Sequence, residues 1–167
     1  MRISFQSLGL KLLPFLLCLC LILFSTIPLF TLPGYLYSFQ FVYIPIFYYA
    51  IYHPKVLSSW VVFILSLLAD LLTTQIFGVY TFSYMVIFFV ANFWRKYFIN
   101  MTFKVLWGIF GLVILGVELF TYFLIWLFSD AGMTMYPIFV EIIVLMLAYP
   151  LFISLCAFLD EKVRNNS

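Results

Sequence analysis

The chain has 167 residues, of which 67% are hydrophobic and only 8% are charged, and its formal net charge is +2. A soluble domain needs roughly 25% charged residues to cover its surface, so this composition excludes a water-soluble globule; so much apolar side chain also excludes a disordered chain. The remaining class is a polytopic membrane protein, and the small net charge gives no reason to expect a nucleic acid partner.

Six apolar runs, in chain order, predict an all-α fold of six transmembrane helices in one domain over residues 1–167. A spanning helix takes about 20 residues, and the runs cover residues 11–30, 36–52, 56–73, 77–94, 105–128 and 136–159. Leu32, Pro33 and Gly34 are expected to form a tight turn between the first two runs. The second run contains Gln40 and Pro45, so it is predicted to be a helix that can be kinked or partly re-entrant.

The basic residues predict the orientation of the chain in the membrane. If the amino terminus is cytoplasmic, the inner segments 1–11, 53–55, 95–104 and 160–167 hold every Lys and Arg, namely Arg2, Lys11, Lys55, Arg95, Lys96, Lys104, Lys162 and Arg164. Cytoplasmic loops collect Lys and Arg, so both termini are predicted to be cytoplasmic. Arg95, Lys96 and Lys104 are expected to hold an inner loop against anionic lipid, or to act only as topology signals.

Three acids, Asp70, Glu118 and Glu141, fall inside the predicted spans, and no Lys or Arg does except Lys11 at the inner edge of the first run. A carboxyl group is costly in the bilayer, so each acid is expected to face protein, a cavity or a partner. It must then be protonated, hydrogen-bonded, hydrated or paired with a cation from elsewhere. Glu141 lies near the outer end of the last run, where it is expected to reach the interface.

Asp70 shares one face of the third predicted helix with hydroxyl side chains, namely Ser59, Ser66, Thr73 and Thr74. This face predicts contact with protein rather than lipid. It is interpreted either as a structural seam, in which the hydroxyls satisfy a neutral carboxyl group, or as a contact with a partner helix.

Two glycines, Gly108 and Gly111, lie on the same side of the fifth predicted helix as Glu118. At about 100° per residue, Gly111 projects about 20° from Glu118 and Gly108 about 80° from it. Bare backbone on one side of a membrane helix lets another helix approach closely, so this side is interpreted as a docking surface for a partner, or as packing within the bundle alone.

Catalytic and metal-binding motifs are not found in the sequence. The sole histidine, His53, has no acid near it along the chain, and Cys18, Cys20 and Cys156 lie within apolar runs, where they are interpreted as ordinary packing residues. We therefore expect a non-enzymatic protein without a cofactor or metal.

Three segments resemble the family of the rod shape-determining protein MreD. They are Tyr48-Tyr49-Ala50-Ile51-Tyr52-His53-Pro54, Leu65-Ser66-Leu67-Leu68-Ala69-Asp70-Leu71-Leu72 and Ile76-Phe77-Gly78-Val79. In that family a tyrosine-containing second helix ends in a proline turn, a G-x-x-x-D-L pattern follows, and L-G opens the next helix. Asp70-Leu71 and Gly78 match this pattern, whereas Ser66 stands where glycine is common.

Two further residues are similar to the family. Pro45 matches a proline found early in its second helix, and Glu118 resembles an acid on its fifth. The similarity covers residues from about 40 to 160 and carries only short, hydrophobic motifs.

The resemblance implies a scaffold of the bacterial cell-elongation machinery in the inner membrane. MreD-like proteins bind MreC and, with it, RodA, a class B penicillin-binding transpeptidase and MreB, and so help to position peptidoglycan synthesis. The family's fold resembles the six-helix substrate-binding component of energy-coupling-factor transporters, which leaves a solute-binding subunit as the alternative. Such subunits often carry alanines at i, i+4 on the first helix, and residues 11–30 contain none.

The residues expected to bind the partner or to latch the bundle are Asp70, Glu118, Gly108, Gly111, Gly78 and Ser66. Because asparagine keeps a neutral hydrogen-bonding group, Asp70→Asn is expected to be mild, whereas Asp70→Leu is expected to weaken assembly.

Overall fold

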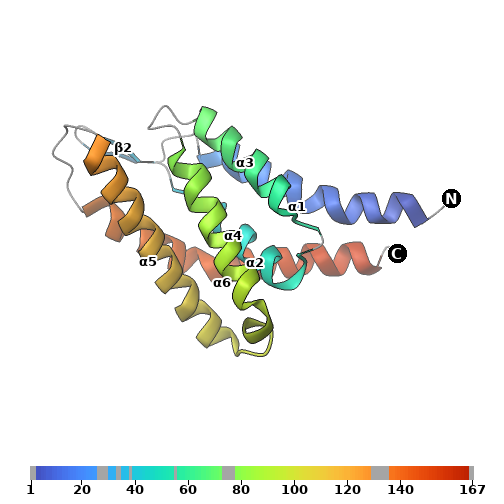
Figure 1. The fold of residues 1–167 in the computed structure, drawn as a ribbon. Coiled ribbons are helices and arrows are strands. Elements are labelled where there is room, and N and C mark those ends of the chain that lie inside the picture. The colour runs from blue at the N-terminus through green and yellow to red at the C-terminus, as the bar shows by residue number, and fades with distance from the viewer. Residues whose placement is uncertain are drawn as a thin grey trace.

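The computed structural model describes residues 3–25, 30–32, 35–37, 39–54, 56–72, 78–128 and 136–165 (Figure 1). The expectation of an α-helical chain is confirmed, because these residues form six helices and one pair of three-residue strands. The elements in order are α1 (Ile3–Ser25), β1 (Phe30–Leu32), β2 (Tyr35–Tyr37), α2 (Tyr43–Tyr52), α3 (Ser59–Leu72), α4 (Val79–Phe98), α5 (Phe103–Phe128) and α6 (Tyr136–Asn165).

The second predicted run differs most from the structure. Its start belongs to a strand ladder in which Phe30 pairs with Tyr37 and Leu32 with Tyr35, and α2 begins only at Tyr43. Aromatic residues favour strands, and hydropathy alone does not separate a strand from a helix in a short apolar run. Of the predicted turn between β1 and β2, Pro33 and Gly34 lie outside the described residues.

Several helices extend beyond their predicted ends. α1 starts at Ile3 and α6 continues to Asn165, because hydropathy measures only the apolar part of a helix while Glu, Lys and Arg are themselves good helix formers. α4 continues to Phe98, so Arg95 and Lys96 lie in its last turn. The connection from α4 to α5 is therefore shorter than the predicted inner loop 95–104, and Lys104 already belongs to α5.

Among the described helices, α5 and α6 are long and apolar enough to cross a membrane, over Phe103–Leu124 and Ile138–Glu161. α2 has ten residues. At 1.5 Å per residue this gives about 15 Å, half of a hydrocarbon core about 30 Å thick. Helix length alone therefore does not establish six crossings.

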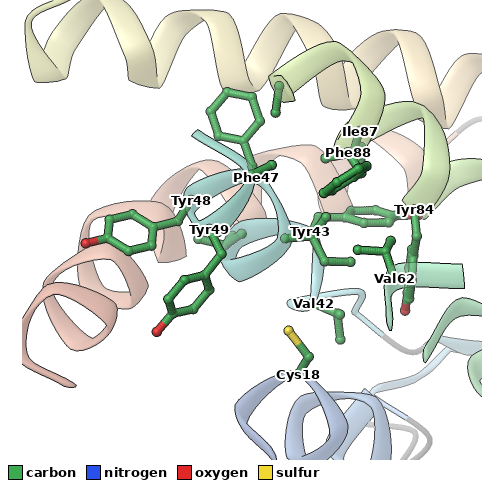
Figure 2. Close-up of a cluster of buried hydrophobic side chains, with 14 of the residues drawn as sticks. Cys18, Val42, Tyr43, Phe47, Tyr48, Tyr49, Val62, Tyr84, Ile87 and Phe88 are labelled. Carbon is green, nitrogen blue, oxygen red and sulfur yellow. The ribbon is translucent and has the colours of Figure 1, made fainter. Parts of the chain in front are cut away.

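α2 forms the centre of the bundle, where nine of its ten residues are buried. Its side chains point toward different helices (Figure 2). The ring of Phe47 lies 5.3 Å from that of Phe110 on α5, and the ring of Tyr43 meets that of Tyr84 on α4 edge-on at 5.5 Å. Aromatic rings bury large apolar areas and prefer such tilted contacts. This short helix is thus the core against which the longer helices pack.

The outward side of the bundle is apolar. Large exposed apolar side chains occur on all of the described helices, including Leu16, Trp60, Ile64, Leu71, Phe89, Phe93, Leu112, Trp126, Leu147, Leu151 and Phe158. Soluble monomers rarely expose contiguous apolar surface of this kind. The exterior therefore fits an apolar environment.

Two side-chain donors join helices by binding main-chain carbonyls. Arg95 Nε donates to the Ile51 oxygen in the last turn of α2 at 2.7 Å, and Trp107 Nε1 on α5 donates to the Met146 oxygen on α6 at 2.9 Å. The last carbonyls of a helix lack intrahelical donors and favour a positive charge. Arg95 therefore stabilises the carboxyl end of the central helix.

The central position of α2 predicts a large difference between two Phe→Ala variants. Phe47 is fully buried, whereas Phe93 is 80% exposed. Phe47→Ala should destabilise the fold by about 3 to 5 kcal/mol because it leaves a cavity in the core. Phe93→Ala, the matched control, should cost less than about 1 kcal/mol. Unfolding of the full chain in detergent measures both, and equal losses would contradict the central packing of α2.

Candidate functional site

Asp70, near the end of α3, caps the amino terminus of α4. Its Oδ1 accepts a hydrogen bond from the Tyr80 N–H at 2.9 Å, and its Oδ2 accepts one from the Thr81 N–H at 2.9 Å. The Thr81 hydroxyl also donates to Oδ2. The first N–H groups of a helix have no intrahelical acceptor and carry partial positive charge. Asp70 is therefore a helix cap supplied by the preceding helix.

Gly78 allows the chain to turn into this position. It is the residue before α4 and has a φ of 99°, the only positive φ among the described residues. A side chain at this φ is strained, and glycine adopts it without cost. We call Asp70, Gly78, Tyr80 and Thr81 the Asp70 joint.

The donors to Asp70 differ from those expected along its own helix. The Ser66 hydroxyl donates to the Phe63 oxygen at 2.8 Å, and Ser59 is exposed. Thr73 and Thr74 lie outside the described residues. The donors to Asp70 are main-chain N–H groups of α4 and the Thr81 hydroxyl, not the hydroxyls predicted on α3. The residues on one helix face do not indicate which donors the next helix will supply.

A second group of polar side chains lies inside the bundle, and we call it the outer polar cluster: Gln40, Tyr43, Tyr84, Glu118 and Glu141. The Gln40 N–H donates to Glu141 Oε1 at 3.1 Å, and the Tyr84 hydroxyl donates to Gln40 Oε1 at 2.8 Å. The Tyr43 hydroxyl interacts with the Glu118 carboxyl group. The cluster joins the segment before α2 to α4, α5 and α6.

Two atoms of the cluster have no hydrogen-bond partner among the described residues, although their surroundings exclude solvent. They are Gln40 Nε2 and Glu118 Oε1, on side chains whose residues are 2% and 6% exposed. Leaving a buried polar atom without a partner costs about 1 to 3 kcal/mol. The cluster therefore has room in its hydrogen bonding for a further polar group.

Glu141 lies deeper in the polar interior than its position in the sequence indicated. It remains partly exposed, but Oε1 binds the N–H of Gln40, which is 101 positions away in the chain. Gln40 and the two tyrosines were not predicted as site residues. A polar residue inside an apolar run was the only sequence signal for Gln40.

The two glycines of α5 face different surroundings. A Cβ at Gly111 would lie 2.6 Å from Met146 Sδ, so Gly111 faces α6, whereas a Cβ at Gly108 would meet nothing within 4 Å. Gly111 and the buried Glu118 face the bundle, and Gly108 lies on the exposed side of α5. A partner approaching α5 from outside would therefore meet Gly108 and not the other two residues.

At the opposite end of the bundle, Asp160 joins α6 to the connection after α2. Its Oδ2 lies 3.1 Å from His53 Nε2 and accepts a hydrogen bond from the Tyr48 hydroxyl at 3.2 Å. The acid that His53 lacks along the sequence comes from a distant helix. Lys96 and Lys104 are exposed near the α4–α5 turn.

Within the described ranges, no three His, Cys, Asp or Glu side chains gather as metal ligands would. Cys18 and Cys156 are buried thiols, and Cys20 is an exposed one. A scan against protein-family models gives no match, and neither a search of curated proteins nor a search of solved structures gives one.

The Asp70 joint changes the expectation for Asp70→Asn. An asparagine keeps one acceptor but turns an NH₂ group toward the donors of Tyr80 or Thr81. Asp70→Asn should therefore cost about 1 to 2 kcal/mol of stability, and Asp70→Leu about 2 to 4 kcal/mol because both N–H groups lose their acceptor. Unfolding in detergent measures the two variants.

Ser59→Ala is the matched control, because Ser59 lies at the exposed start of the same helix. A stability for Asp70→Asn equal to that of the unsubstituted chain would show that the cap contributes nothing.

Proposed function

We propose that the protein is a non-catalytic membrane scaffold of the bacterial cell-elongation machinery, acting as MreD-like proteins do. The observation that supports this most is the Asp70 joint, because Asp70 and Gly78 are the residues that match the family pattern. In the structure both serve one purpose, the fixed joining of α3 to α4. Both carboxyl oxygens of Asp70 are occupied as acceptors, which suits a rigid support rather than a reacting group.

The proposed scaffold crosses the inner membrane six times with both ends in the cytoplasm. The start of α1 and the end of α6 lie at the same end of the molecule, and the end of α5 and the start of α6 lie at the other (Figure 1). Arg95, Lys96 and Lys104 gather around the α4–α5 turn, as expected for an inner segment. The exposed Lys96 and Lys104 would each gain about 1 kcal/mol from anionic lipid.

In this arrangement α2 does not cross the membrane alone. The β1–β2 ladder and α2 together would form one crossing that is only partly helical. Non-helical backbone is tolerated at membrane depth only where protein surrounds it. The burial of nine of the ten residues of α2 supports this proposal.

The partner surface that we propose is the exposed side of α5 around Gly108 and Leu112. Gly108 leaves open space beside the backbone, and Leu112 is 73% exposed next to it. A single helix of an MreC-like partner could approach closely there, and RodA, a class B penicillin-binding transpeptidase and MreB would then be reached through that partner. Each contact of this type is worth about 0.6 to 2 kcal/mol.

A second candidate function is solute binding, as in the membrane subunit of an energy-coupling-factor type transporter. The observation that favours it is the outer polar cluster, where Glu141 is partly exposed near the start of α6 and two buried polar atoms lack partners. A scaffold does not require such a cluster.

Blocking the open space on α5 should weaken partner binding. Gly108→Leu places a large side chain where nothing lies within 4 Å, so the fold should tolerate it. Binding to a co-expressed single-span MreC-like partner should fall roughly 3- to 30-fold. Ala157→Leu, which enlarges an exposed small residue on α6, is the control. Equal binding by both variants in a quantitative pull-down would exclude Gly108 from the interface.

Depletion in cells separates the two candidate functions. Loss of the scaffold should make rod-shaped cells round, because side-wall synthesis loses its organisation. The unsubstituted chain and Phe93→Ala should restore the rods, and Asp70→Leu should restore them poorly. Recovery of rod shape by an added vitamin or other nutrient would instead favour solute binding.

A further inference from the structure

The two unpartnered atoms of the outer polar cluster are of opposite kinds. Among the described residues, Gln40 Nε2 carries hydrogens that find no acceptor, and Glu118 Oε1 is a carboxyl oxygen that finds no donor. If the two atoms were in contact they would satisfy each other. Because neither has a partner, the two atoms do not bond each other, and each needs a further polar group.

Several other polar atoms of the cluster are already engaged. Gln40 Oε1 accepts a hydrogen bond from the Tyr84 hydroxyl, and Glu141 Oε1 accepts one from the Gln40 N–H. The Tyr43 hydroxyl interacts with Glu118. No Lys or Arg belongs to the cluster. Rearranging these bonds to satisfy one free atom would leave another without its partner.

We propose that the cluster binds one small hydroxyl-bearing molecule, which accepts from Gln40 Nε2 and donates to Glu118 Oε1. A hydroxyl group does both, whereas a cation cannot accept a hydrogen bond and an anion would be repelled by the two acids. Buried waters typically make about three hydrogen bonds to groups of this kind. The hydroxyl comes from water or from a small solute, and the partly exposed Glu141 marks the side from which either would enter.

The site does not depend on the scaffold role, since partner binding is proposed on the exposed side of α5. A crystal structure of the full chain grown in a lipid mesophase tests it directly. An isolated density peak within hydrogen-bond distance of Gln40 Nε2 and Glu118 Oε1 would identify water, and a peak continuing into a larger molecule would identify a solute hydroxyl. An empty site, or a direct bond between the two side chains, would overturn the proposal.

Thermal unfolding of four variants in detergent gives a second test that needs no crystals. Gln40→Met and Glu118→Met should each lower Tm by roughly 3 to 8 °C, because each leaves the bound hydroxyl and a neighbour without a partner. The double variant removes both ends of the site, so its loss should be clearly smaller than the sum. Glu118→Gln, the conservative control, keeps an oxygen acceptor and should lower Tm less than Glu118→Met. Additive losses in the double variant would overturn the proposal.

Discussion

Main-chain groups left open inside an apolar bundle must find partners within the protein, and this requirement explains the contacts that hold the ends of the central elements. Asp70 satisfies the first N–H groups of α4, Glu141 satisfies the Gln40 N–H ahead of α2, and Arg95 binds a carbonyl in the last turn of α2. In each case a polar side chain from one element completes the end of another. Asp70, Glu141 and Arg95 therefore act where the backbone of another element begins or ends.

These contacts give the bundle a rigid centre. α2 is enclosed by aromatic rings, and its two ends are held by Gln40 on one side and by Arg95 on the other. A bundle fixed in this way can present an unchanging outer surface to lipid and to partner helices. The scaffold proposed for the elongation machinery needs that property more than it needs a reactive group.

The outer polar cluster is different, because its hydrogen bonds are incomplete. In the described part of the chain, Glu118 and Gln40 each retain a buried atom without a partner, while both carboxyl oxygens of Asp70 accept hydrogen bonds. Buried acids thus have two different roles. Asp70 completes the hydrogen bonding between α3 and α4, whereas Glu118 belongs to a cluster among α2, α4, α5 and α6 whose hydrogen bonding is incomplete. A bound molecule would therefore contribute most to stability in the outer polar cluster.

The sequence by itself determined the helical class, the approximate position of each helix and the burial of Asp70 and Glu118, because these depend on composition and on periodicity within one segment. Tertiary structure alone decided which donors satisfy Asp70, that Gly111 and Gly108 face different surroundings, and that Glu141 meets Gln40. It also decided that the start of the second predicted run, residues 36–52, belongs to a strand pair and not to a helix. Each of these results depends on a partner from a distant part of the chain, and the periodicity of a single helix carries no information about which other element will face it.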